Sequence, residues 1–321
     1  MFVLHVEILY QVMIKDFEIT TQKNITLIAP KNVARVHKFE LDHIFYNDLI
    51  KSKKQICFCR NFKNPYLPEL QDYCRSFDVV FLESEGFMAL DHNEYNALDP
   101  SKYIFISGDV ESTHQHHFIP VDWLRTTCNF SKVNKKLWSK NKKYYLTARM
   151  NVPRQWKVEL LSKLYDNKNL TWSALEAHPQ IPGSPKIFES EKKGSNIELP
   201  SIEQMLSWSL LCLETEDKDI TEKTYQHIYQ PIPTIWHTTK SISYLEQFGL
   251  TIKFNGFDYS YLDMPREQKV NSLVKTIRSM NADDFKDFFH QNIKETENNY
   301  KIMRDYNFWY QLFRPKIQQH L

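Results

Sequence analysis

The chain has 321 residues, of which 42% are hydrophobic and 14% aromatic, and this composition suits two globular domains rather than a disordered chain. No run of eighteen apolar residues occurs, so a membrane-spanning helix is not expected. The five cysteines form no C-x-x-C pair, so neither a disulfide framework nor a zinc ribbon is expected. The six glycines match neither the dinucleotide-binding nor the P-loop pattern, and the net charge of +2 does not by itself indicate a class of binding partner.

The first residues predict a strand rather than a targeting segment. Residues 2–9 are apolar but are interrupted by His5 and Glu7, and neither a basic start nor a small-residue cleavage site follows. We therefore expect a cytoplasmic protein with reduced thiols.

Short apolar runs alternate with helix-like stretches over the first 120 residues. Further strands are predicted at 25–29, 55–59, 78–82 and 103–107, with helices at 41–51 and 66–75. This alternation is typical of a mainly parallel sheet covered by helices. Cys57 and Cys59 alternate on one predicted strand, so both are expected to face the same core. We expect residues 1–125 to form a Rossmann-like domain, and residues 126–142, which are polar and rich in Lys and Asn, to form a linker.

A second alternation begins at residue 143. Strands are predicted at 144–147, 170–172, 208–214 and 234–237, and helices at 153–165, 202–206, 222–229, 241–248, 266–280, 283–297 and 300–319. Residues 171–199 contain three prolines and two glycines and are expected to form a long loop. We expect residues 143–299 to form a second Rossmann-like domain, and residues 300–321 to form a helix that packs back on the first one.

The most informative segment is 208–237, WSLLCLETEDKDITEKTYQHIYQPIPTIWH. Its order is a buried strand, an acidic loop, Thr-Glu-Lys, a helix, a proline break and another buried strand. A helix N-terminus favours an anion, because its first N–H groups have no partner within the helix. Lys223 adds a positive charge suited to a diphosphate, and Glu222 can accept hydrogen bonds from ribose hydroxyls.

This order resembles the donor-binding motif of α1,3-fucosyltransferases and related viral-type glycosyltransferases of the GT-B class. The matching residues are Glu214, Thr221, Glu222 and Lys223. The resemblance implies that Glu222 binds the ribose and Lys223 the diphosphate of a nucleotide sugar, with a UDP- or GDP-sugar expected.

The same enzymes carry an arginine after the first strand of the C-terminal domain, where it clamps the donor phosphates. Arg149 and Arg154 both follow the predicted strand at 144–147, and the resemblance leaves both as candidates. It implies a GT-B fold, in which two Rossmann-like domains face a cleft, with C-terminal helices. The expected activity is transfer of a sugar to an acceptor hydroxyl, without a metal or another cofactor.

Inverting transfer requires a base, for which a carboxylate is the usual choice. Functional side chains of doubly wound sheets follow the carboxyl ends of strands. Glu85 follows the predicted strand 78–82, and Gly86 permits a tight turn that would expose it. Asp109 follows the strand 103–107. We rank Glu85 first and Asp109 second.

Two short segments contain possible metal ligands, but we interpret each of them as a surface loop or turn. Asp217-Lys218-Asp219 is a D-x-D that runs directly into Thr-Glu-Lys, and we interpret it as an acidic turn. The cluster of His114, His116 and His117 lacks a further ligand at matching spacing, and we interpret it as a polar loop.

Residues 123–158 contain ten basic and no acidic residues. Lys135, Lys136, Lys142 and Lys143 lie at the expected domain junction, where they could contact an anionic acceptor. A modified base in DNA is one such acceptor, a glycan or a protein is the alternative, and a solvated linker is the third interpretation. A non-catalytic nucleic-acid-binding α/β protein is the competing class.

Overall fold

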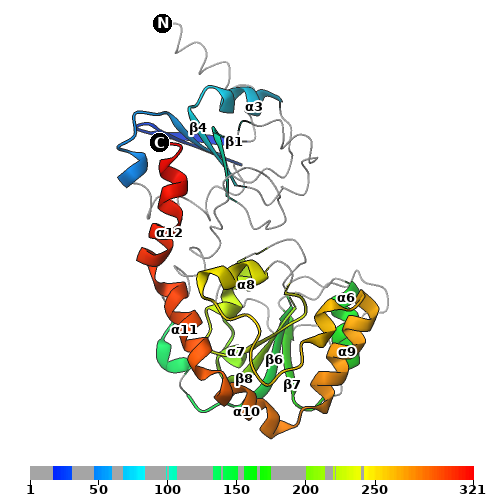
Figure 1. Ribbon diagram of the computed structural model, residues 1–321. Helices are drawn as coiled ribbons and strands as arrows, with labels where there is room; N and C mark the ends of the chain where they lie inside the picture. The colour runs from blue at the N-terminus through cyan, green and yellow to red at the C-terminus, as the bar shows by residue number, and fades with distance from the viewer. Residues whose placement is uncertain are drawn as a thin grey trace, which may run out of the picture. The chain divides into compact units, whose positions relative to one another are not determined.

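The computed structural model describes residues 17–30, 47–59, 68–83, 99, 101–106, 133–138, 140–150, 155–164, 167–174, 200–213, 220, 222–239 and 242–321. The chain divides into two compact units (Figure 1). The first unit comprises residues 1–124 and 306–321, and the second comprises residues 125–305. No helix among the described residues is long and apolar enough to cross a membrane.

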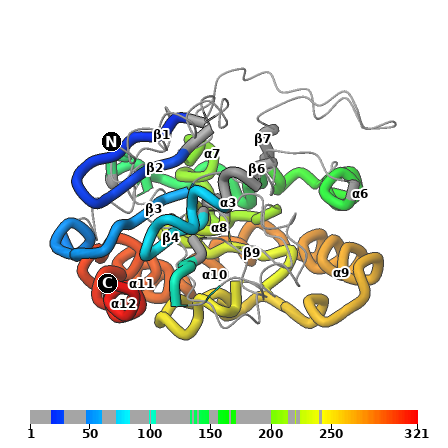
Figure 2. The backbone as a smooth tube through the Cα atoms, turned by 90° about the horizontal axis from the view of Figure 1, so that it is seen from above, coloured from blue at the N-terminus to red at the C-terminus, as the bar shows by residue number. Residues whose placement is uncertain are grey.

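The first unit contains a five-stranded sheet in the order β1-β2-β3-β4-β5. The strands are β1 (Phe17–Gln22), β2 (Ile25–Pro30), β3 (Ile56–Cys59), β4 (Val79–Glu83) and β5 (Tyr103–Ile106). Strands β2 to β5 are parallel, and helix α3 (Pro68–Arg75) connects β3 with β4. All four residues of β3 are buried, as expected for a parallel strand covered on both faces. Figure 2 shows β1 to β4 following one another in this order.

The hairpin of β1 and β2 was not predicted from the sequence. Gln22 pairs with Ile25, so Lys23 and Asn24 form a two-residue turn. Lys23 has a φ of 55°, the left-handed conformation that such turns require. The predicted strand at 2–9 lies outside the described residues.

The last helix, α12 (Tyr306–Gln318), belongs to the first unit. Asp48 accepts a hydrogen bond from the Tyr310 hydroxyl at 2.8 Å and forms an ion pair with Arg314 at 3.3 Å. The ammonium group of Lys54 donates to the His320 carbonyl oxygen at 2.7 Å. These contacts join residues more than 260 positions apart in the sequence.

The second unit contains a fully parallel sheet in the order β7-β6-β8-β9. Its strands are β6 (Tyr144–Met150), β7 (Leu170–Ala174), β8 (Ser207–Cys212) and β9 (Thr234–Trp236). The connecting helices are α6 (Gln155–Leu164), α7 (Ile202–Met205) and α8 (Glu222–Ile228). The prediction of an α/β protein with parallel sheets and C-terminal helices is confirmed.

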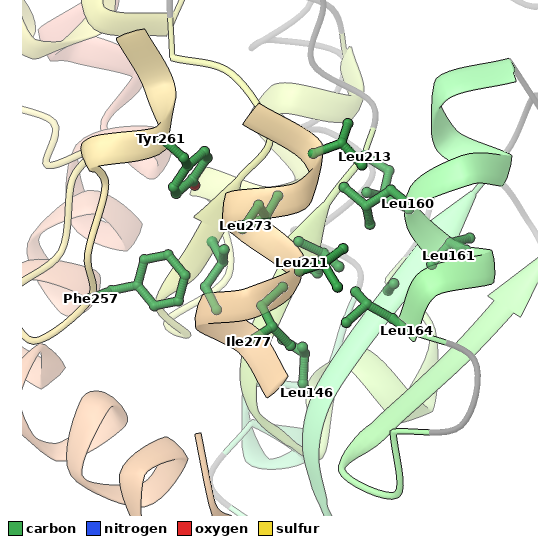
Figure 3. Packing of buried hydrophobic residues seen from close by; sticks show 14 of the residues in the cluster. Leu146, Leu160, Leu161, Leu164, Leu211, Leu213, Phe257, Tyr261, Leu273 and Ile277 are labelled. Atoms are coloured by element: carbon green, nitrogen blue, oxygen red, sulfur yellow. The ribbon is translucent and has the colours of Figure 1, made fainter. Parts of the chain in front are cut away.

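One face of this sheet carries the main core of the second unit. Leu146 and Leu211 of the strands pack in one cluster with Leu160 of α6 and Leu273 of α9 (Arg266–Ser279), all labelled in Figure 3. All four side chains are fully buried. Burying a leucine contributes roughly 1.5–3 kcal/mol, so this face fixes α6 and α9 on the sheet.

The C-terminal helices end at other residues than predicted. The sequence predicted helices at 283–297 and 300–319, whereas the structure has α10 (Ala282–Gln291), α11 (Ile293–Arg304) and α12. The break at Asn292 has a clear cause, because its buried side chain donates to the carbonyl oxygens of Asn255 and Phe288 and accepts from the Asn255 N–H. Residues 242–248, predicted as an α-helix, form the 3-10 helix η4.

The segment predicted as a linker is partly built into the second unit. The 3-10 helix η2 (Lys135–Leu137) precedes Trp138, which is 6% exposed. The Trp138 ring packs edge-on against Tyr300 at 6.1 Å. This aromatic contact was not predicted, because the lysines and asparagines around Trp138 indicated a polar linker.

Candidate functional site

The strand order of the second unit contains a point at which the chain changes direction. The connection from β6 leads to β7 on one side, whereas β8 lies on the other side of β6. Parallel sheets bind ligands in the crevice at such a point, beyond the carboxyl ends of the strands. Arg149 pairs with Cys212, and Cys212 pairs with Trp236, so β6, β8 and β9 end level with one another. We call this side of the sheet the carboxyl edge.

Several residues singled out in the sequence come to the carboxyl edge. Arg149 is the second-to-last residue of β6. Helix α8 begins with Glu222 and Lys223, after the segment that follows β8. Glu214, Thr221 and Arg154 lie outside the described residues. The backbone therefore brings together two segments that are far apart in the sequence, the end of β6 and the start of α8.

An aromatic stack at the carboxyl edge was missed in the sequence. The ring of Trp156, in the first turn of α6, stacks on the imidazole of His237 at 3.8 Å and 17°. His237 directly follows β9, and its N–H donates to the Cys212 carbonyl oxygen at 3.4 Å. The position of His237 after the buried strand Thr-Ile-Trp was the available signal, because residues in that position project from the carboxyl edge.

The same edge is rich in buried polar groups. Lys157 is 2% exposed, and its ammonium group lies 5.6 Å from the centre of the Trp156 ring. Thr224, Thr238 and Thr239 are also buried. The Thr224 hydroxyl has no hydrogen-bond partner within the described part of the chain. Charges and hydrogen-bond donors act more strongly here than in water, because the local dielectric constant is lower.

The basic block lies at the opposite edge of the sheet. Lys142 and Lys143 immediately precede β6, and the Lys143 N–H donates to the carbonyl oxygen of Leu206, just before β8, at 2.8 Å. A strand of seven residues such as β6 spans roughly 20 Å. Within the second unit, Lys142 and Lys143 therefore lie at the opposite end of β6 from Arg149.

The four lysines of the block also differ in their surroundings. Lys136 and Lys143 are exposed, whereas the Lys142 ammonium donates to the Met205 carbonyl oxygen at 3.1 Å and lies 5.0 Å from the Phe289 ring centre. Burial lowers the pKa of Lys142 to about 8. Lys135 contributes its backbone to η2. Lys142 is therefore part of the packing of the second unit.

The two carboxylates predicted as bases, Glu85 and Asp109, lie outside the described residues. Each follows a described strand of the first unit, and the last residues of these strands, Glu83 and Ile106, pair with each other. Asp217, Asp219 and the three clustered histidines also lie outside. The described residues contain no group of three His, Cys, Asp or Glu side chains that fits a metal ion.

Comparisons with known proteins give a weak structural likeness. No family model matches the chain, and no curated protein matches it. One similar solved structure is described as trehalose-6-phosphate from E. coli bound with UDP-2-fluoro glucose; it has a TM-score of 0.43 and 10% identity, over 95% of this chain and 90% of that chain. An apo structure of OtsA has a TM-score of 0.41 and 11% identity, over 99% of this chain and 96% of that chain.

Proposed function

We propose that the chain is a GT-B glycosyltransferase, which moves a sugar from a nucleotide-diphosphate sugar to an acceptor hydroxyl. The observation that carries this proposal is the reversal of strand order at β6, which has β7 on one side and β8 on the other. The backbones of Arg149, Glu222 and Lys223 reach this same edge. A diphosphate bound there would meet the positive charges of Arg149 and Lys223.

The proposed reaction divides into recognition and chemistry. Glu222 accepts hydrogen bonds from the ribose, and Lys223, with Arg149 or Arg154, neutralises the diphosphate. Glu85, or in its place Asp109, removes the proton of the acceptor hydroxyl. The acceptor oxygen then bonds to the anomeric carbon, while the bond from that carbon to the diphosphate oxygen breaks. The basic side chains stabilise the negative charge that develops on the departing nucleotide diphosphate.

Donor binding is tested by removing one charge at the carboxyl edge. Lys223→Ala is expected to weaken the binding of a UDP- or GDP-sugar by roughly 1.5–3 kcal/mol, the range for hydrogen bonds to charged groups. Isothermal titration calorimetry measures the change, after a thermal-shift panel of nucleotide sugars has identified the donor. Lys143→Ala removes an exposed lysine from the opposite edge and serves as the matched control. Equal affinities of the two variants would remove Lys223 from the donor site.

Metal independence is a second expectation of the proposal. Basic side chains and main-chain N–H groups replace the cation that a D-x-D enzyme uses to hold the diphosphate. Transfer, followed as release of nucleotide diphosphate, is therefore expected to continue at an unchanged rate with EDTA. A loss of activity that Mn²⁺ or Mg²⁺ restores would instead make Asp217 and Asp219 the metal ligands.

The acceptor is proposed as a modified base in DNA, with a glycan or a protein hydroxyl as the alternative. The exposed lysines Lys136, Lys140 and Lys143 support an anionic partner. The same lysines also suit the second candidate function, a non-catalytic nucleic-acid-binding protein. Hydrolysis or transfer of a nucleotide sugar favours the enzyme, whereas DNA binding without any nucleotide-sugar binding favours the second candidate.

A further inference from the structure

Three cysteines meet in the core of the first unit. Cys57 and Cys59 are two positions apart on β3 and therefore point to the same face of the sheet. Cys74 reaches this face from α3, and all three side chains belong to one buried cluster with Val80 and Tyr103. The three thiols are at most 2% exposed, and none of them forms a disulfide.

The three thiols also interact with one another. The Cys74 sulfur is hydrogen-bonded to the thiols of both Cys57 and Cys59. These hydrogen bonds hold the pKa of Cys74 well below its ordinary value, whereas burial raises the pKa of Cys57. The positive charge of Lys102, whose ammonium group donates to the Arg75 carbonyl oxygen at 2.7 Å, lowers both pKa values. Because Cys74 interacts with both of the other thiols, it is the one that can react with either of them.

Geometry restricts which of these cysteines can be joined. Two residues at alternate positions of a strand are roughly 6.6 Å apart, whereas the Cβ atoms of a disulfide are about 3.5–4.5 Å apart. Cys57 and Cys59 therefore cannot be joined to each other, and Cys74 must take part in any disulfide of the cluster. No three such side chains among the described residues are arranged for a metal ion, so the chemistry left to the trio is that of thiols and disulfides.

We propose that this trio is a site of oxidative modification, at which Cys74 forms a disulfide with Cys57 or Cys59. A hydroperoxide is the oxidant. The Cys74 thiolate attacks one peroxide oxygen, the O–O bond breaks, and Cys74 becomes a sulfenic acid as water or an alcohol leaves. The thiol of Cys57 or Cys59 then attacks the Cys74 sulfur, and the S–S bond forms as the sulfenic oxygen leaves as water. The remaining thiol can exchange into this disulfide.

Access to the buried thiols comes through local opening of α3. This helix has only eight residues, and its Asp72 and Arg75 are exposed. A helix of this length has little stability of its own and depends on its packing against the sheet. Opening of α3 exposes Cys74 and uncovers Cys57 and Cys59 together. A disulfide formed there ties α3 to β3.

Peptide mapping tests the proposal directly. The native protein is treated with hydrogen peroxide and then unfolded in a denaturant that contains an alkylating reagent, which blocks the remaining free thiols. The protein is then digested with trypsin. Cleavage after Lys54, Arg60, Lys63 and Arg75 separates peptide 55–60, which holds Cys57 and Cys59, from peptide 64–75, which holds Cys74. We expect the two peptides to be joined after oxidation, with the loss of two hydrogens, and to separate again with a reductant.

Single variants identify the partners. Cys74→Ala is expected to abolish the linked peptides, whereas Cys57→Ala and Cys59→Ala should each leave one linkage. Cys212→Ala, which removes a buried cysteine of the second unit, is the matched control and should leave the map unchanged. Amide hydrogen exchange of residues 68–75 is expected to slow at least several-fold in the oxidised protein, because the disulfide suppresses the opening of α3.

Two results would overturn the proposal. One is native protein in which peptides 55–60 and 64–75 stay separate at peroxide concentrations that oxidise the same chain in urea. The other is a map in which Cys74 is joined to Cys128 or Cys212 instead. The wild-type map decides the question even if Cys74→Ala does not fold, and it does not depend on the proposed transferase activity.

Discussion

The second unit keeps the ammonium group of Lys142 in a largely buried place. It has one carbonyl partner, that of Met205, and the face of the Phe289 ring. Burial disfavours the charged form and lowers the pKa of Lys142 from 10.5 to about 8. This difference corresponds to a net free-energy cost of roughly 3 kcal/mol for the charged form.

This buried charge makes stability depend on pH. Between pH about 8 and 10.5 the unfolded chain binds more protons than the folded one, so stability rises with pH through this window. Below pH 8 Lys142 is protonated in the folded protein as well, so the full free-energy cost of burying its charge is present. Lys142→Met keeps the aliphatic stem and removes the charge, so it is expected to raise the free energy of unfolding at pH 7 by about 1–2 kcal/mol.

Urea denaturation at pH 7 and pH 10 measures this effect. The difference between Lys142→Met and the wild type should shrink at pH 10, where the wild-type lysine is neutral in the folded state. Lys143→Met changes the exposed neighbour and should leave stability unchanged at both pH values. A Lys142→Met variant that is less stable at pH 7 would show that its hydrogen bond outweighs the cost of burial.

At the scale of strands and helices, the order of elements was largely predictable. A parallel strand such as β3 is buried on both faces, so its sequence is a continuous apolar run. The hairpin was harder, because its turn consists of Lys23 and Asn24 rather than the Asn-Gly pair that marks such turns. The break at Asn292 depends on a partner, Asn255, that is 37 residues away and thus invisible to local patterns.

The candidate site was predictable only in part. The rule that functional residues follow the carboxyl ends of strands identified the segments after β6 and β8, but the contact of Trp156 with His237 depends on tertiary packing. The distance between the lysine block and the donor residues could not be predicted from the sequence, for a geometric reason. Lys143 is only six residues from Arg149 in the sequence, yet the extended strand β6 places them at opposite edges of the sheet.

Separation of the two edges makes a prediction about charge. Replacing the exposed lysines Lys136, Lys140 and Lys143 together by Gln is expected to leave nucleotide-sugar affinity unchanged, because none of them is among the proposed donor-binding residues. DNA binding by the same variant should lose up to roughly 3 units from the slope of log K against log salt, since each lysine neutralises at most one phosphate. Calorimetry and fluorescence anisotropy at several salt concentrations measure the two quantities.

The two outcomes are independent. A weaker donor affinity would contradict the separation of the edges. An unchanged slope would show that the lysines are merely solvated, and a glycan or protein acceptor would then become the better proposal.

At the scale of the whole molecule, the chain returns to its first unit after completing its second. Asp48 links this returning segment to the unit through Tyr310 and Arg314. Asp48→Ala is expected to destabilise the first unit by about 1–2 kcal/mol, because it leaves the Tyr310 hydroxyl and the Arg314 guanidinium without this acceptor. Amide exchange should become faster in α12 and stay unchanged in α11.

Asp72→Ala provides the comparison. Asp72 pairs with Arg75 at 2.8 Å, but both side chains are more than half exposed, and such surface pairs contribute little. Exchange in α12 that is equally fast in the two variants would show that Asp48 does not hold this helix.

The place of α12 also sets an order of events during synthesis. A ribosome adds about 5–20 residues per second, so the roughly 180 residues of the second unit take on the order of 10–40 s to emerge. During this time residues 1–124 are outside the ribosome without the segment 306–321 that completes their unit. The second unit is continuous in sequence and can fold as soon as it emerges. The part of the chain that is made first is therefore the part that finishes folding last. It is also the part that a chaperone most needs to protect.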